Sequence, residues 1–315
     1  MSHRQGRNCI IPEERSFDSD GVNLHYIDWG GAGRPLVLLA GLGDTAHLYR
    51  SLAPKLASRF RVVGLTRRGH GRSGRPDSGY DLDTFVQDIR RFLDTLGIER
   101  SILVGHSFGG LEMPLFAIRH PQRVEAIVYL DALFPRLDPE PDLSGDPIWS
   151  VLPTGGPTAD DLISREAYLA YYKRALPAWA RIWCEAMEAD LMDKVTIEED
   201  GRLEFHHDDE LMNRIYREVW PFWNPDYPRV EAPMLAIVPD GDYHQGVPLD
   251  ATEEFRIAAD RYWEEKLLPW IRQRTQVFRQ AAPTACVVEL DSPYHHIFLA
   301  EEGETVLAVN EFLAG

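Results

Sequence analysis

The chain has 315 residues, of which 50 are acidic and 33 are basic, so its formal net charge is −17 at pH 7. Nucleic acids and anionic membranes are bound mainly through clustered lysines and arginines, and this charge therefore argues against both as partners. The apolar runs are far too short to cross a bilayer, and the first residues, MSHRQGRNCI, contain no apolar segment of a signal peptide. The three cysteines have no metal-binding spacing. These features predict a reduced, cytoplasmic protein, and none of them specifies an oligomeric state.

Short apolar runs alternate with helical patterns through the first 133 residues. This alternation predicts strand–helix units on a mostly parallel sheet flanked by helices, which is an α/β fold. Apolar side chains recur at helical spacing between Leu82 and Leu96, and Gly97 ends that helix. A second helix is expected over residues 108–120. The expected strands are residues 22–29, 35–40, 61–65, 101–105 and 124–130.

The pattern changes over residues 134–229, where no convincing strand run is present. Prolines cluster at both ends of this segment, and helical stretches rich in Trp and Tyr lie between them. We therefore expect a core built from residues 1–133 and 230–315, interrupted by a helical insertion at residues 134–229. The elements expected after the insertion are a strand at 233–238, a long helix around 252–280, a strand at 285–290 and a helix at 301–313.

A serine between two glycines is the strongest functional signal. Gly105-His106-Ser107-Phe108-Gly109 has the pattern G-x-S-x-G and lies between a predicted strand and a predicted helix. This is the context of a nucleophile elbow, a turn so tight that both glycines must lack side chains. The turn exposes the Ser107 hydroxyl, and the following helix points its N-terminus at any negative charge that develops there. Ser107 is therefore the predicted nucleophile.

Several motifs resemble those of the α/β-hydrolase family, and the resemblance covers nearly the whole chain outside the insertion. They are Gly41-Leu42-Gly43, the segment Arg68-Gly69-His70-Gly71-Arg72-Ser73, the elbow, and the acid and histidine motifs near the C-terminus. The resemblance implies an α/β-hydrolase fold with a helical cap at residues 134–229. It also implies an oxyanion hole formed by the backbone N–H groups of Leu42 and Phe108. The chain departs from the family at Ala40, where relatives usually have His, and at Thr66, where they often have Asp.

A serine nucleophile needs a histidine base and an orienting acid, which follow it in this fold in the order acid, then histidine. The resemblance places the acid at Asp242, after the strand at 233–238, with Asp131, after the strand at 124–130, as the alternative. For the base, the resemblance favours His295 over its neighbour His296, because His295 aligns the following Phe-Leu pairs without gaps. His296 is then expected to pack against other side chains.

The predicted activity is hydrolysis of a carboxylic ester or lactone through an acyl-enzyme, with no metal or organic cofactor. The aromatic residues of the insertion favour an apolar or aromatic ester as the small-molecule substrate. The same triad also serves C–C bond hydrolases, amidases, perhydrolases and hydroxynitrile lyases, and the fold also serves as a ligand-binding receptor. A serine disfavours the epoxide-hydrolase and dehalogenase branches, which use Asp at this point. Glu112, in the apolar helix after Ser107, is expected to pair with Arg67 or Arg68.

Overall fold

The computed structural model describes residues 12–152, 155–206, 209–220 and 223–314. The N-terminal residues on which the signal-peptide prediction rests lie outside these ranges. None of the helices within them combines the length and the apolar composition needed to cross a bilayer.

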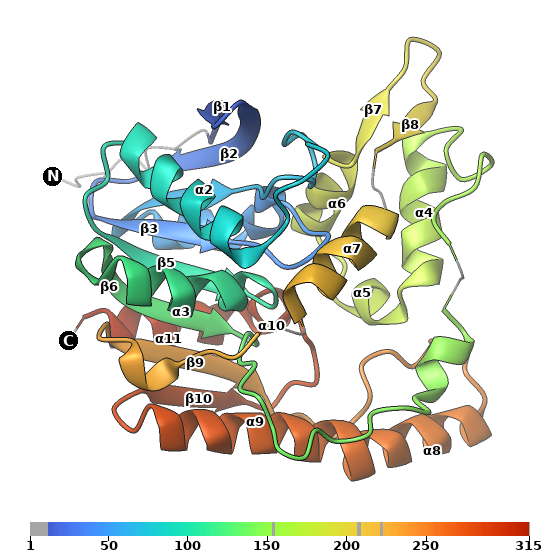
Figure 1. Ribbon diagram of the computed structural model, residues 1–315. Coiled ribbons are helices and arrows are strands. Elements are labelled where there is room, and N and C mark those ends of the chain that lie inside the picture. Colours follow the sequence, from blue (N-terminus) through green and yellow to red (C-terminus); the bar gives the residue numbers. More distant parts are fainter. Residues whose placement is uncertain (1–11, 153–154, 207–208, 221–222, 315) are drawn as a thin grey trace, which may run out of the picture.

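An eight-stranded sheet forms the centre of the molecule, in the order β1-β2-β4-β3-β5-β6-β9-β10 (Figure 1). The pairs β1–β2 and β2–β4 are antiparallel, and the other neighbours are parallel. Strands β5 and β9 are buried at every position, and β3, β4 and β6 at all but one or two, as expected when helices cover both faces. The strands are β1 (Glu13–Ser19), β2 (Val22–Gly30), β3 (Arg34–Leu39), β4 (Phe60–Leu65), β5 (Ser101–His106), β6 (Val124–Leu130), β9 (Met234–Pro239) and β10 (Cys286–Leu290).

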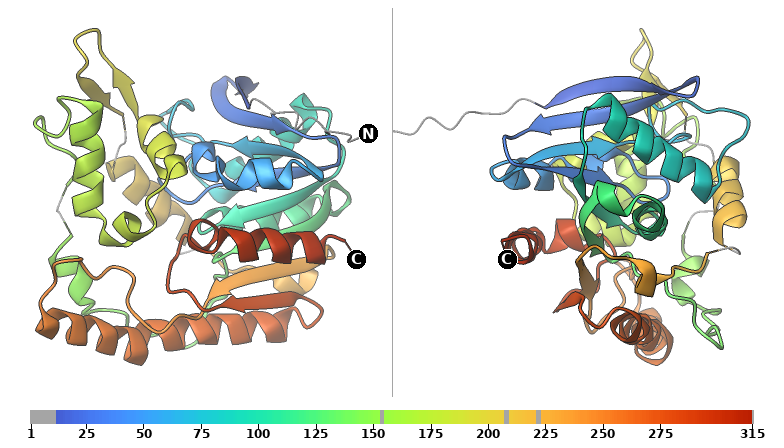
Figure 2. Two further views of the ribbon diagram at one scale, coloured as in Figure 1. Left: turned by 180° about the vertical axis from the view of Figure 1, so that it is seen from behind. Right: turned by 60° about the vertical axis from the view of Figure 1, so that its left-hand side comes forward.

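Helices pack on both faces of this sheet and close two separate apolar cores. Three helices lie on one face, namely α2 (Leu82–Thr95), α3 (Gly109–Arg119) and α9 (Leu268–Ala281). On the other lie α1 (Leu52–Leu56) and α11 (Glu302–Phe312), which Figure 2 shows from behind. These layers confirm the predicted α/β architecture, and each strand predicted from the sequence is present.

The segment between β6 and β9 is mainly helical and sits beside the carboxyl ends of the strands (Figure 1). One expectation for it is wrong, because β7 and β8 form a two-stranded antiparallel hairpin around a turn that includes Gly201 at φ +84°. These strands are only three residues long and mostly not fully buried, so they lack the apolar run on which sequence reading depends. The elements are α4 (Arg165–Ala175), α5 (Pro177–Arg181), α6 (Glu185–Met192), β7 (Val195–Ile197), β8 (Leu203–Phe205) and α7 (Asp209–Val219).

The long helix expected before the last strand is present as α8 (Glu253–Tyr262) and α9, joined by a π-helical turn at Trp263–Leu267. Trp263 is buried, and its indole N–H donates to the carbonyl oxygen of Gly241 over 2.9 Å. This contact ties the helix to the loop after β9. Strand β1 was not predicted, because its residues are mostly polar and exposed at the edge of the sheet.

Candidate active site

Ser107 lies at the sharp turn between β5 and α3, with φ at +47°. A residue other than glycine rarely adopts this conformation, so the turn stores strain that the surrounding packing must hold. A Cβ atom on Gly109 would lie 2.5 Å from the Leu39 carbonyl oxygen, and one on Gly105 would lie 2.6 Å from Met113. Both glycines of the motif are therefore required by close packing, as the elbow prediction demands.

The imidazole of His295 is held by a buried carboxylate at the end of β6. Its Nδ1 lies 2.6 Å from Oδ2 of Asp131, a residue that is 5% exposed. Asp131 itself has φ at +42°, and its backbone N–H donates to the carbonyl oxygen of Ile237 in the neighbouring strand β9. Because Nδ1 is engaged by Asp131, Nε2 is the nitrogen left for a proton-transfer partner.

The prediction that Asp242 pairs with the histidine is wrong. Asp242 is exposed, whereas the alternative considered above, Asp131, makes the hydrogen bond. The loop after β9 is fixed through Gly241, whose N–H donates to the Ser292 carbonyl and whose own carbonyl accepts from Trp263. A Cβ on Gly241 would lie only 2.5 Å from the backbone of Pro293, so the chain passes very close to the histidine loop there. The next side chain, Asp242, then points to solvent.

His295 and His296 have different surroundings. The ring of His106, next to the elbow serine, lies 4.6 Å from that of His295, and its Nε2–H donates to the His295 carbonyl oxygen over 3.0 Å. His296 is buried, and its ring packs edge-on against Trp179 of α5 at 5.2 Å. Its Nε2 lies 3.6 Å from Asp44 rather than beside Asp131. The His106 ring lies as close to that of His296, at 4.7 Å, so it is the contact with Asp131 that distinguishes His295 from His296.

Arg67 holds the loop that carries Leu42. Its guanidinium donates to the carbonyl oxygens of Ala40, over 3.0 Å, and Gly41, over 3.2 Å, and it also pairs with Glu112. A Cβ on Gly41 would lie 3.4 Å from Cβ of Ser107, so this loop runs directly beside the elbow. Glu112 is therefore part of a buried ion pair, as expected. Sequence reasoning missed the contacts of Arg67 to Ala40, the position at which relatives usually have His.

Comparisons with known proteins agree with the fold described above. Residues 34–159 match a family model described as alpha/beta hydrolase fold. The structure superposes on E-2-(acetamidomethylene)succinate hydrolase with a TM-score of 0.68 over 97% of this chain and 100% of that one, at 20% identity. A thioesterase domain from the curacin biosynthetic pathway superposes with a TM-score of 0.67, over the same shares of the two chains, at 16% identity. The chain therefore has the α/β-hydrolase fold.

The curated proteins that are similar in sequence to this chain are named for several different activities. A putative non-heme haloperoxidase of Mycobacterium phage D29 is 43% identical over 103 residues, which is 32% of this chain and 37% of that protein. Epoxide hydrolase 4 of Mus musculus is 33% identical over 129 residues, 40% of this chain and 35% of the relative. The alignments thus span well under half of the length of these two relatives. Alignments this short assign none of these activities to the chain.

Charge around the site favours an ionised acid. Burial alone would raise the pKa of Asp131, but the hydrogen bond and charge of His295, with the nearby Arg274, lower it below its usual value. Burial lowers the pKa of His106 to about 4, which keeps this ring neutral at pH 7. Asp44 is buried, yet His106 and His296 hold its pKa well below the usual range. At neutral pH both buried carboxylates are therefore ionised, Asp131 beside His295 and Asp44 beside His296.

The helical segment contacts the loop beside the elbow through charged side chains. Asp190 of α6 accepts from the backbone N–H of Thr45 over 2.7 Å and pairs with Lys194 at 2.5 Å. Leu42 and Phe108, whose N–H groups were predicted to form the oxyanion hole, belong to one apolar cluster with Phe134 and with Trp223 of the helical segment. The predicted oxyanion residues thus lie under side chains from residues 134–229.

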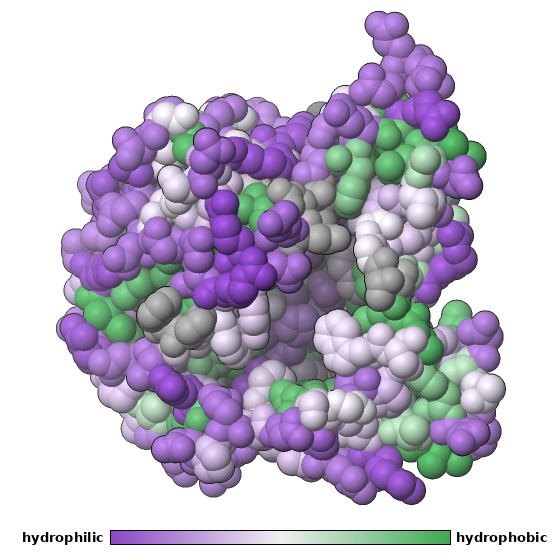
Figure 3. Space-filling model, turned by 45° about the vertical axis from the view of Figure 1, so that its right-hand side comes forward, coloured by the Kyte–Doolittle hydropathy of each residue, from purple (hydrophilic) through white to green (hydrophobic). Residues whose placement is uncertain are grey.

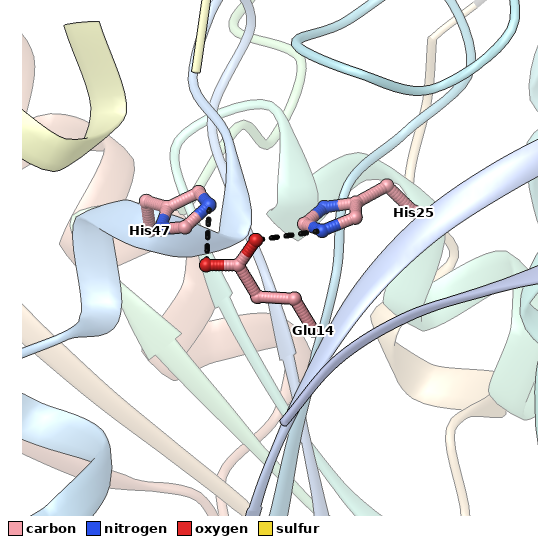
Figure 4. Close-up of side chains that lie close together, drawn as sticks. All are labelled: Glu14, His25 and His47. Atoms are coloured by element: carbon pink, nitrogen blue, oxygen red, sulfur yellow. Dashed lines mark ion pairs between the residues drawn. The ribbon is translucent and has the colours of Figure 1, made fainter. Parts of the chain in front are cut away.

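A second group of histidines lies away from the elbow. Glu14, His25 and His47 approach one another, with Glu14 oxygens 3.7 Å from His25 Nε2 and 3.8 Å from His47 Nε2 (Figure 4). Such a set could ligate a transition metal by residue type alone. However, the guanidinium of Arg72 donates to Glu14 and to Asp193, both over 2.5 Å, and its Nη2 lies 3.1 Å from His47 Nε2. We interpret this group as an ion-pair network between β1, β2 and residue 193, because Arg72 already bonds to both of its carboxylates.

Proposed function

We propose that this chain is a serine hydrolase that cleaves a carboxylic ester or lactone through a covalent acyl-enzyme. The observation that carries the proposal is the 2.6 Å contact between Asp131 and His295, whose carbonyl oxygen accepts from His106, the residue before the serine of the strained elbow. A nucleophile, a base and an orienting acid are the groups that acyl transfer requires. In this proposal Ser107 is the nucleophile, His295 the general base and Asp131 the orienting acid.

The first half of the reaction forms the acyl-enzyme. Nε2 of His295 removes the proton of the Ser107 hydroxyl as its oxygen bonds to the substrate carbonyl carbon. The carbonyl oxygen becomes an oxyanion, which accepts from the backbone N–H groups of Leu42 and Phe108. The ester C–O bond then breaks, and the imidazolium returns its proton to the leaving alkoxide. Asp131 stabilises the imidazolium during this half and keeps Nε2 directed at the elbow.

Water completes the cycle through the same groups. His295 removes a proton from a water molecule as the water oxygen bonds to the acyl carbon, and a second oxyanion forms between Leu42 and Phe108. Collapse of this intermediate breaks the bond between the acyl carbon and the Ser107 oxygen, which takes the proton back from His295, and a carboxylic acid is released. Arg67 supports both halves, because its bonds to Ala40 and Gly41 fix the loop that presents the Leu42 N–H.

We also propose that residues 134–229 act as a cap over a core of residues 1–133 and 230–315. The contacts of Asp190 with Thr45 and of Trp179 with His296 support this division, because they join the cap to the loops around the site. A cytoplasmic location and independence of metal or organic cofactors remain predictions of the sequence.

The test is a panel of p-nitrophenyl esters of rising acyl length, assayed with wild type and Ser107→Ala. We expect turnover of part of the panel by wild type and only the uncatalysed rate with Ser107→Ala. Turnover retained in the variant would contradict the proposal. Binding of esters without product formation would favour a receptor. Because one curated relative is named as a haloperoxidase, the assay is repeated with hydrogen peroxide present, and a product formed only then would favour perhydrolysis.

A further inference from the structure

A pocket of about 410 Å³ opens between the loop after β6, helix α7 and helix α9. Its walls include one buried cation, Arg274, and five aromatic side chains, namely Phe134, Tyr216, Trp220, Trp223 and Trp270. Figure 3 shows the molecule hollowed on the face where the cap meets the core. A volume of this size holds a substituted aromatic ring.

The pocket adjoins the proposed catalytic groups from two sides. Phe134 and Trp223 pack in the same apolar cluster as Leu42 and Phe108, the residues of the proposed oxyanion hole. Nη2 of Arg274 lies 3.5 Å from Oδ1 of Asp131. The proposed catalytic residues do not themselves line the pocket. The inference below therefore requires a substrate arm that passes Phe134 on its way from Ser107.

Arg274 is 5% exposed, and its hydrogen-bonding capacity is largely unused. One N–H donates to the carbonyl oxygen of Leu133 over 2.9 Å, and the guanidinium stacks 3.7 Å from the centre of the Trp270 ring. Its Nε has no hydrogen-bond partner among the residues that the structure describes. The contact to Asp131 is longer than a normal hydrogen bond, and that carboxylate is already bonded to His295.

A guanidinium has five N–H donors, and burying one with donors unpaired is costly. Such a site is completed by an acceptor that enters the pocket, and a planar carboxylate matches the geometry of a guanidinium best. Arg136 also lines the pocket and Glu140 is its one acidic lining residue, so cations outnumber carboxylates there. The pocket thus has an excess of positive charge, whereas the chain as a whole has a net charge of −17, which repels anions.

We propose that this pocket binds an aromatic carboxylate arm of the ester substrate, with Arg274 as the residue that recognises the carboxylate. The inference rests on the proposed function, since it names the substrate class of the same site. Phe134 and Trp270 contact the aromatic ring, and the edge of the guanidinium between them contacts the carboxylate.

The test compares esters that differ only in charge. One pair, 4-acetoxybenzoate and 4-acetoxybenzamide, places the charge on the leaving group; the other, phenyl 4-carboxybenzoate and phenyl 4-carbamoylbenzoate, places it on the acyl group. For each pair we measure the ratio of kcat/KM, carboxylate over amide. This ratio cancels any effect of Arg274 on Asp131 that is common to both substrates.

In wild type we expect a ratio of about 10 to 100 for at least one pair, the usual value of a hydrogen-bonded charge pair. Arg274→Met should bring that ratio to about 1 or below, and Arg274→Lys should keep part of it. The matched control is Arg272→Met on the same helix, where the exposed Arg272 pairs with Asp240 at 2.6 Å. It should leave the ratio unchanged. Equal ratios in wild type and Arg274→Met for both pairs would overturn the inference.

A binding measurement separates this inference from the proposed function. Calorimetric titration of Ser107→Ala with benzoate and with benzamide needs no turnover and no change at Arg274. We expect benzoate to bind at least about 10-fold more tightly. Equal or tighter binding of benzamide would contradict the inference even if esters are hydrolysed. Failure of all four esters to turn over, with benzoate still preferred, would contradict only the hydrolase proposal.

Discussion

The ends of β6 and β9 lie side by side in the sheet, and each is followed closely by an aspartate, but the two carboxylates have opposite surroundings. Asp131 is buried, sits at positive φ and contacts His295 and Arg274, whereas Asp242 is exposed. Position at the carboxyl edge of a parallel sheet thus brings a residue near the site without deciding its role. The path of the next few backbone atoms decides it, and here the packing of Gly241 against Pro293 turns Asp242 outward.

The largest effect should come from the histidine that distinguishes the two aspartates. His295→Ala removes the proposed base, so kcat should fall by about 10⁴ or more. His296→Ala loses the packing on Trp179 and His106 and the contact with Asp44, but not the contact with Asp131, so its kcat should fall much less. Steady-state kinetics on both variants, with circular dichroism to confirm folding, measures the difference. A dead His296→Ala with an active His295→Ala would show that the base has been assigned to the wrong residue.

The comparison of the acids themselves comes next. Asp131→Asn keeps the shape but removes the charge that stabilises the His295 imidazolium, so kcat should fall by about 10⁴, as with the equivalent change in a serine protease. Asp242→Asn is expected to change kcat by less than about 2-fold, because the free-energy effect of a surface substitution is usually within about 0.5 kcal/mol. Melting curves of both variants check that each is folded at the temperature at which kcat is measured. A larger loss in Asp242→Asn would restore the original assignment.

A smaller loss is expected from the arginine that holds the Leu42 loop. Arg67→Met frees the carbonyls of Ala40 and Gly41, so the proposed oxyanion donor loses its fixed position and kcat should fall by about 10²-fold. The adjacent Arg68 is the matched control, because its guanidinium is directed to Asp88 of α2, through two 2.7 Å contacts, rather than to the loop. Arg68→Met should lower the melting temperature with little change in kcat. Equal losses of kcat in the two variants would contradict a positioning role for Arg67.

The smallest effect concerns stability in acid. The pKa of Asp131 is lower in the folded chain than its ordinary value of about 3.9. Its ionisation therefore stabilises the fold fully above the unfolded pKa, and this contribution is lost as pH falls through the folded pKa. The free energy of unfolding is measured in urea for wild type and Asp131→Asn between pH 7 and pH 3. It should fall less steeply with decreasing pH in the variant. If the free energy of unfolding of the variant falls at least as steeply as that of wild type, the lowered pKa of Asp131 would be contradicted.

The sequence predicted the sheet, the elbow and His295 because each has a local signature: an apolar run, a glycine spacing, or a histidine before a terminal helix. It could not separate Asp131 from Asp242, because both follow buried strands and only the tertiary path of the chain distinguishes them. The contacts of Arg67 with Ala40 and of Arg274 with Asp131 join residues 27 and 143 positions apart, so no periodicity reveals them. The β7–β8 hairpin was missed because its strands carry too few buried apolar residues.

The most direct test of the account is the site and rate of reaction with a fluorophosphonate in wild type, Asp131→Asn and Asp242→Asn. The phosphonyl group should form one adduct, on Ser107, located by peptide mapping. The labelling rate should fall by orders of magnitude in Asp131→Asn and stay near that of wild type in Asp242→Asn, because only Asp131 supports the base that activates the serine. An adduct on another residue, or a slow Asp242→Asn beside a fast Asp131→Asn, would contradict the account.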